Sequence, residues 1–174
     1  DTMPEPARSV WKSVATGVPT LLEVDGLPDA EAADVDLPLV EFVEGLLDQL
    51  FSFEFTLTEA DYNADGTPSG KTKVDRPKSD SARPLVAILA TRNQAVDDAT
   101  DAVHRLHKKH DLTESDLIAS TVDSWQGQTN AITIALHPLT GASELDEFNS
   151  AFGRLAVTCT RATHGLLLVS RPGL

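Results

Sequence analysis

The sequence has little sulfur and no long hydrophobic run. Its 174 residues include a single cysteine, Cys159, which excludes an intrachain disulfide and suits a reducing cytoplasm. No apolar stretch approaches the roughly 20 residues of a membrane-spanning helix, and none has the pattern of a signal peptide. The sequence therefore predicts a cytoplasmic protein with no membrane partner.

Positive charge is also scarce. The chain has 14 lysines and arginines against 27 aspartates and glutamates, which gives a formal net charge of -13. Residues 1–61 hold 14 of the acids and 2 of the bases, whereas residues 62–174 hold 13 acids and 12 bases. Free-standing nucleic-acid-binding proteins are normally basic, because phosphate neutralisation dominates their affinity. The composition thus argues against tight nucleic-acid binding by this chain alone.

The apolar residues predict one domain in which strands and helices alternate. A chain of 174 residues that is 41% hydrophobic can bury one good core, so residues 1–174 are expected to form a single domain. Hydrophobic patterning predicts strands at 18–24, 51–57, 84–90, 117–122, 131–136 and 166–169, and helices at 36–50, 94–110 and 148–162. Buried strands separated by helices predict an α/β fold, with a parallel sheet covered by helices on both faces.

A polar segment at about 58–83 interrupts this alternation. It has few apolar anchors and predicts a flexible polar insertion, for which disorder is an alternative. Within it, Gly66–Thr72 resembles a phosphate-binding loop, but its first glycine stands one position too late. No amphipathic helix follows to hold a phosphate at its N-terminus. An independent nucleotide-binding protein is therefore the weakest hypothesis for this chain.

No metal site is predicted. Asp61–Gly66 begins like a calcium-binding loop, but Thr72 stands where the bidentate carboxylate is needed, and Asx turns explain the segment better. Histidines 104, 107 and 110 recur at helical spacing and could invite a metal ion. Positive charge at the end of a helix is the better interpretation, since it suits the helix dipole and no cysteine or acidic ligand pattern accompanies them.

Two arginines share one stripe of the predicted helix at 148–162. Arg154, Thr158 and Arg161 recur at i, i+4 and i+7, so the two guanidinium groups leave the same side about 10 Å apart. This geometry suits one extended polyanion or two neighbouring phosphates. A solvated helix face is the alternative interpretation.

The order of elements over 117–170 resembles the second RecA-like domain of superfamily 1 helicases. A strand runs into the turn Asp123-Ser124-Trp125-Gln126-Gly127-Gln128, and a second strand, the arginine helix and a last strand follow. The resemblance is closest to the group that includes the nonsense-mediated-decay and Okazaki-fragment helicases, and extends more weakly back to residue 18. It implies a RecA-like, P-loop-NTPase-like parallel sheet in a three-layer α/β/α arrangement.

The arginine helix resembles motif VI of that family, which reads approximately Arg-Leu-Asn-Val-Ala-Leu-Thr-Arg-Ala. Arg154, Leu155, Val157, Thr160, Arg161 and Ala162 occupy the matching positions. The resemblance implies that Arg161 is the arginine finger, which reaches the γ-phosphate of ATP held by a first RecA-like domain. It implies that Arg154 assists at the same cleft.

The turn after residue 121 resembles motif V. Thr121, Trp125, Gln126 and Gly127 match it, with Trp125 in place of the usual phenylalanine. Thr129 and Ala131 stand where the family has glutamate and aspartate. The resemblance assigns ATP contacts to Gln126, Gly127 and Thr129, although the threonine hydroxyl lacks the two acceptor oxygens of a carboxylate. It assigns contacts with single-stranded nucleic acid to Thr121, Ser124 and Trp125.

An upstream segment resembles motif IV less fully. Gln94 matches the family glutamine and is assigned to ATP binding, whereas Ala90 and Thr91 depart from the pattern. Arg92 is the candidate for a second arginine at the γ-phosphate. A solvated loop cation is its alternative interpretation.

The chain supplies neither a Walker A lysine nor a strand ending in the Asp-Glu pair that holds magnesium. The resemblance places both in a first RecA-like domain of the same polypeptide, which would bind ATP and Mg²⁺. The expected function is that of the C-terminal motor domain of an ATP-dependent helicase acting on single-stranded nucleic acid, DNA in preference to RNA. As a separate fragment the chain is expected to bind no cofactor and to be inactive. A degenerate helicase-like binding or regulatory module without ATPase activity is the alternative.

Overall fold

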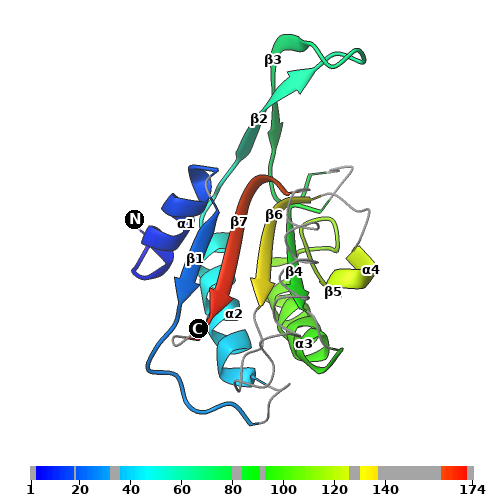
Figure 1. Cartoon of the computed structure of the whole chain (residues 1–174). Coiled ribbons are helices and arrows are strands. Elements are labelled where there is room, and N and C mark those ends of the chain that lie inside the picture. The colour runs from blue at the N-terminus through cyan, green and yellow to red at the C-terminus, as the bar shows by residue number, and fades with distance from the viewer. Residues whose placement is uncertain are drawn as a thin grey trace, which may run out of the picture.

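A five-stranded sheet forms the centre of the computed structural model (Figure 1). The structure describes residues 3–17, 19–31, 36–79, 84–90, 93–125, 130–136 and 162–171. The strands of the sheet are β1 (Thr20–Glu23), β4 (Val86–Ala90), β5 (Leu117–Thr121), β6 (Asn130–Leu136) and β7 (Ala162–Ser170). They lie in the order β1-β7-β6-β4-β5, and every neighbouring pair is parallel. The predicted α/β fold class is confirmed, and the arrangement is consistent with a RecA-like fold.

Helices lie on both faces of the sheet. One face is covered by α1 (Ala7–Ala15), α2 (Leu37–Phe51) and α3 (Asn93–His110), which pack with the even-numbered side chains of β4 and β6. On the opposite face, the short α4 (Val122–Trp125) packs its tryptophan against Ala87, Leu89 and Ala135. Successive side chains of a strand point to opposite faces, so β4 and β6 contribute to both layers.

Helix α2 forms where its apolar stripe predicts it. The side chain of Asp36 caps the helix by accepting the backbone N–H of Leu39 at 3.2 Å, and Pro38 occupies the first turn. The six apolar residues expected on its inner stripe are all buried, namely Leu39, Val40, Val43, Leu46, Leu47 and Leu50. The predicted helix at 94–110 is likewise confirmed as α3, which ends in histidines and lysines as its dipole prefers.

Helix α1 was not expected from the sequence and contributes an important part of the core. Trp11 is buried, and its indole N–H donates to the carbonyl of Leu46 at 3.0 Å, which ties α1 to α2. Val14 packs so closely on β7 that a Cβ added to Gly165 would lie 2.6 Å from its Cγ1. Glycine at this position therefore permits the close approach of helix and strand.

The polar segment contains a β-hairpin instead of the disorder considered from the sequence. Strands β2 (Leu57–Tyr62) and β3 (Pro68–Asp75) pair in antiparallel register and project from the end of the sheet where its strands begin (Figure 1). The Asx turn is confirmed, because Asp65 Oδ1 accepts the backbone N–H of Thr67 at 3.0 Å and its hydroxyl at 2.6 Å. Most of Gly66–Thr72 lies in β3, so it does not form a phosphate-binding loop before a helix.

Two boundaries differ from the sequence prediction. Residues 51–57 were expected to form a strand, but Phe51 ends α2, Ser52 caps it, and pairing begins only at Leu57. Ala162 was expected in the arginine helix, but it is the first residue of β7. The rest of that predicted helix lies outside the described residues. Among the helices in the described ranges, none has the length and apolar composition needed to cross a bilayer.

Candidate functional site

The carboxyl ends of β4 and β6 form a switch point in the sheet. The two strands are neighbours, but β4 leads through α3 to β5 on one side, whereas the strand after β6 is β7 on the other side. Connections that diverge in this way leave a crevice outside the strand ends, which is where open parallel sheets bind ligands. The lower edge of the sheet in Figure 1 is therefore the candidate site.

Thr121 and Ser124 lie at this edge. Thr121 is the last residue of β5 and pairs in register with Ala90, the last residue of β4. Its hydroxyl oxygen accepts the backbone N–H of Ser124 at 3.0 Å, and this bond closes the single turn of α4. Ser124 is exposed. Both residues, which the sequence suggested as nucleic-acid contacts, are thus held beside the switch point.

Trp125 faces the sheet rather than solvent. Its side chain is 7% exposed and packs on Ala87 and Leu89 of β4. The indole N–H donates to Asn130 Oδ1 at 3.0 Å, while the amide nitrogen of Asn130 donates to the carbonyl of Ile132 at 2.6 Å. In this conformation the ring is unavailable for base stacking, and Trp125 acts as an anchor that fixes α4 to the sheet.

The turn that follows is bounded by two fixed residues. Gln126, Gly127 and Thr129, predicted to contact ATP, lie outside the described residues. Trp125 immediately before this turn and Asn130 immediately after it are both buried and hydrogen-bonded to each other. Ala131, which replaces the family aspartate, is 0% exposed within β6.

The predicted site also contains three arginines. These residues, Arg92, Arg154 and Arg161, lie outside the described residues. Gln94 is in the first turn of α3, where the structure describes the backbone but not the side chain of this residue. Because α3 begins just after β4 ends, this turn lies at the same edge as Thr121. The structure thus brings Gln94, Thr121 and Ser124 to one edge of the sheet.

A further arginine lies at this edge and was missed in the sequence. Arg171 directly follows β7, and its Nε and a terminal nitrogen donate to the two carboxylate oxygens of Asp36 at 2.7 and 2.8 Å. The same terminal nitrogen donates to the carbonyl of Pro28 at 2.6 Å. Hydrogen bonding to Asp36 raises the pKa of Arg171 above its ordinary value. The two residues are far apart in sequence, and no local pattern links them, so only the fold reveals this pair.

Two histidines of α3 have structural partners. His107 Nε2 lies 2.8 Å from the carbonyl oxygen of Leu117, and His110 Nε2 lies 2.7 Å from Asp48 Oδ1. Across the described ranges, no three His, Cys, Asp or Glu side chains come close enough together to hold a metal ion. These contacts join α3 to β5 and to α2.

The comparisons with known proteins add no family to this picture. No protein-family model matches the chain, and a search of curated proteins finds no match. Functional inference therefore depends on the order of the motif residues and on the geometry of the sheet edge.

Proposed function

We propose that this chain is the second RecA-like motor domain of a superfamily 1 helicase. The observation that carries the proposal is the position of the Thr121–Trp125 turn, which leaves the carboxyl end of β5 beside the switch point and beside the start of α3. A motor of this class needs its motif V turn at this edge, where nucleotide and nucleic acid can both influence it. The match of Arg154–Ala162 to motif VI supports the same assignment.

The nucleotide would bind between this edge and a first RecA-like domain. The first turn of α3 directs backbone N–H groups toward the edge, and helix N-termini favour phosphate. Gln94 belongs to this turn, and Arg92 precedes it. Arg161 would act as the arginine finger, with Arg154 beside it, whereas the first domain would supply the Walker A lysine and the Mg²⁺ ligands. ATP and Mg²⁺ would thus bind mainly to the missing partner domain.

The single strand would contact the other side of the turn. Ser124 is exposed, and the Thr121 hydroxyl fixes its backbone by accepting its N–H, so its side-chain hydroxyl is held where it can contact a phosphate. Gln126, Gly127 and Thr129 stand in the sequence between Trp125 and Asn130. Because these two residues are anchored in the sheet, a shift of the turn on ATP binding would be passed to β4 and β6 through packed side chains. Binding of ATP would in this way move the nucleic-acid contact.

The arginine finger provides the direct test. In a polypeptide that contains both RecA-like domains, Arg161→Ala is expected to lower ATP turnover by about 10³-fold or more while ATP binding changes little. Arg8→Ala is the control, because Arg8 is an exposed residue of α1 that pairs with Glu5 at 3.0 Å. Normal turnover by the Arg161 variant would refute the assignment.

A degenerate helicase-like module without ATPase activity is the second candidate. Ala131 favours it, because a fully buried alanine in β6 offers no carboxylate where the family has one. Wild-type protein with both domains would then bind single-stranded DNA but show no strand-stimulated ATP turnover. Measuring turnover with and without the strand separates the two candidates.

A further inference from the structure

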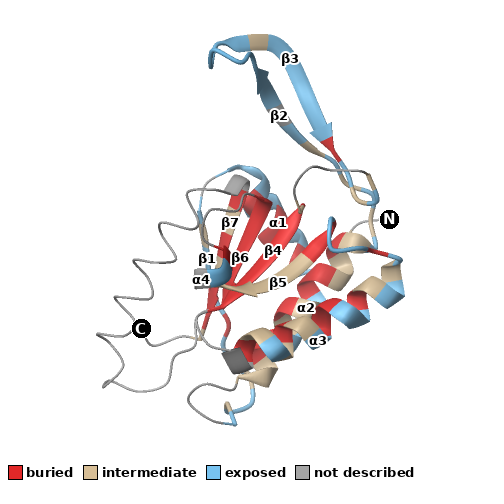
Figure 2. Ribbon diagram, turned by 90° about the vertical axis from the view of Figure 1, so that its right-hand side faces the viewer, coloured by how far each residue is buried: buried red, intermediate tan, exposed pale blue. Residues whose placement is uncertain are grey.

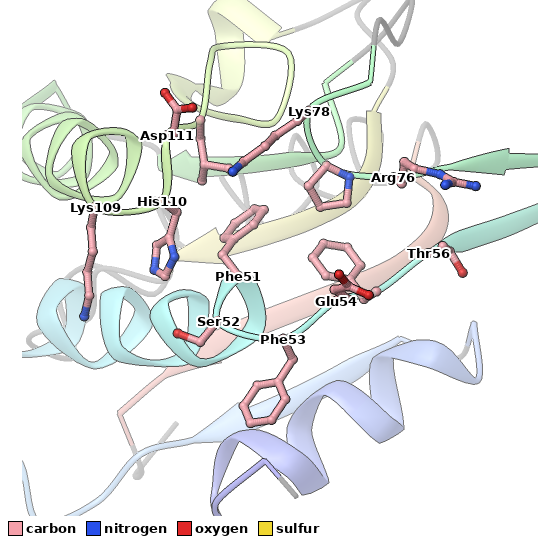
Figure 3. A pocket seen from close by; sticks show the side chains of 13 residues that line it. Phe51, Ser52, Phe53, Glu54, Thr56, Arg76, Lys78, Lys109, His110 and Asp111 are labelled. Atoms are coloured by element: carbon pink, nitrogen blue, oxygen red, sulfur yellow. The ribbon is translucent and has the colours of Figure 1, made fainter. Parts of the chain in front are cut away.

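A cavity of about 870 Å³ lies at the opposite edge of the sheet from the switch point. It is lined by the end of α2, the end of α3 and the two segments, 52–56 and 76–78, that join the β2–β3 hairpin to the rest of the chain (Figure 3). The side chains around it are Phe51, Ser52, Phe53, Glu54, Phe55, Thr56, Arg76, Pro77, Lys78, Lys109, His110, Asp111 and Leu112. Its volume is within the range of small-ligand sites, which is about 300–1,000 Å³.

Aromatic rings form one wall of the cavity. Phe51 and Phe55 are each partly exposed, so they offer ring surface to a ligand, whereas the ring of Phe53 points away from that of Phe51 (Figure 3). The rings of Phe51 and Phe55 meet edge to face with their centroids 5.7 Å apart, and His110 lies 6.3 Å from Phe51. These contacts hold the rings in place without covering them completely. Such a wall can stack with a nucleobase, since every base has a π-face.

Four lysine and arginine side chains lie on β3 and on the segment that leads from it to the cavity. Lys71 and Lys73 lie on β3, and Arg76 and Lys78 follow on the return of the chain; we call these four residues the basic strip. All four are exposed, and within the described structure none forms an ion pair. The one acid in this stretch, Asp75, is 5% exposed. The strip is therefore a local concentration of accessible positive charge on a chain whose net charge is -13.

The strip leads from the hairpin to the cavity. Lys73 lies on β3 opposite Glu59 of β2, and Lys71 lies where the register of the hairpin shifts. Arg76 and Lys78 line the cavity itself. The cavity also has acidic side chains, Glu54 and Asp111, and Lys109 is paired with Asp48 at 3.0 Å. The cationic side chains of the cavity that form no ion pair in the described structure, Arg76 and Lys78, thus lie on the side that continues from β3.

We propose that the basic strip and the cavity form a second contact for single-stranded nucleic acid. Phosphates would lie along Lys71, Lys73, Arg76 and Lys78, and one base would enter the cavity and stack on the phenylalanine wall. The inference rests on the proposed function, because it lengthens the path of the same strand to the far edge of the sheet. Charge complementarity to phosphate and the aromatic wall favour this occupant over an acidic peptide.

The test is a salt-dependent titration of this chain with a fluorescein-labelled dT12 oligonucleotide, followed by fluorescence anisotropy from low ionic strength upward. The double variant Arg76→Glu and Lys78→Glu is expected to weaken binding at least tenfold. It is also expected to reduce the slope of log K against log salt by about 1.4, which is the loss of two phosphate contacts with a single strand. The matched control is Lys12→Glu with Lys108→Glu, which changes two exposed lysines elsewhere by the same charge.

A second variant tests the aromatic wall. Phe55→Leu keeps an apolar side chain but removes the ring, so binding should weaken about fivefold or more with an unchanged salt slope. The inference is overturned if the two charge variants weaken binding equally, if polyglutamate competes as well as unlabelled dT12, or if wild-type protein does not bind at low ionic strength. These outcomes leave the motor proposal intact, because that proposal depends on ATP turnover by the Arg161 variant.

Discussion

The five-stranded sheet and the β2–β3 hairpin are both built of extended strands, parallel in the sheet and antiparallel in the hairpin, but they differ most in burial (Figure 2). Every residue of β4 and β6 is buried, whereas in β3 only Asp75, where the hairpin joins the rest of the molecule, is buried. The sheet is covered on both faces, and the hairpin is not. A two-stranded hairpin without a packed face is only marginally stable in water. We therefore expect the sheet and its helices to determine unfolding, while the hairpin is free to serve in binding.

The largest difference between the sheet and the hairpin is expected when one valine in each is shortened to alanine. Val86 in β4 is 0% exposed, whereas Val74 in β3 is 47% exposed. Val86→Ala is expected to lower the free energy of unfolding by about 3 kcal/mol, because a buried cavity remains, and Val74→Ala by less than about 0.5 kcal/mol. Urea denaturation of both variants measures the difference. Equal losses would show that the hairpin belongs to the same cooperative core.

A somewhat smaller effect is expected at the carboxyl edge of the sheet. Arg171 and Asp36 are 19% and 14% exposed, and Asp36 also caps α2. Arg171→Ala is expected to cost about 2 kcal/mol, since a partly buried carboxylate loses its two charged hydrogen bonds. Arg171→Lys should retain part of this stability, because a lysine keeps the charge but loses the bidentate geometry. Thermal unfolding of both variants checks the predicted order of their stabilities. An Arg171→Ala variant as stable as the wild type would contradict it.

The link between α2 and α3 is expected to depend on pH. Burial alone would raise the pKa of Asp48, but hydrogen bonds from Lys109 and His110 outweigh it and hold the pKa below its ordinary value of 3.8. A carboxylate with a lowered pKa stabilises the fold above its unfolded pKa, and this stability is lost as pH falls through the folded pKa. Asp48→Asn should thus cost about 0.5–1 kcal/mol at neutral pH and progressively less in acid.

Urea unfolding of the wild type and of Asp48→Asn from neutral pH into the acid range measures this change. Asp25→Asn is the matched control, because Asp25 is exposed and has no ion pair in the described structure. A difference between wild type and Asp48→Asn that stays constant over the whole pH range would contradict the assignment.

The smallest effect is expected in the hairpin turn. Asp65→Ala removes both hydrogen bonds to Thr67, so amide exchange in β2 and β3 should become several-fold faster. The thermal midpoint of the whole chain should not change, because the turn is not part of the core. Hydrogen exchange read residue by residue tests the first statement and thermal unfolding tests the second, and a lower midpoint would show that hairpin and sheet are coupled.

Elements with a strong hydrophobic period were predicted well. The stripe of α2 and the apolar runs of β4, β5, β6 and β7 depend on local spacing, and the structure confirms each of them. Residues 51–57 show where such reasoning fails. Their side chains do alternate between partly buried and exposed, but a strand also needs a paired neighbour, which only Leu57 finds, in Asp75. The hairpin was missed because its pairing stabilises polar residues that have no hydrophobic period.

Some residues of the candidate site could be found from the sequence, and others only from the structure. Thr121 and Ser124 were selected from the sequence by a resemblance that stays a prediction, and the structure places their turn at the carboxyl edge of the sheet. The role of Trp125 could not be predicted, because burial depends on Ala87, Leu89 and Asn130, which come from two other strands. Arg171 gave no signal, since its partner lies at the start of α2.

The sequence by itself determined which segments become strands and helices, because a hydrophobic period is a local property of neighbouring residues. It also determined that the chain is acidic and has one cysteine, and it supplied the resemblance on which the helicase proposal rests. Tertiary structure alone decided the strand order, the switch point, the inward position of Trp125 and the cavity beneath the hairpin. These features arise when distant segments share one core, and the free energy of that packing depends on all of them at once.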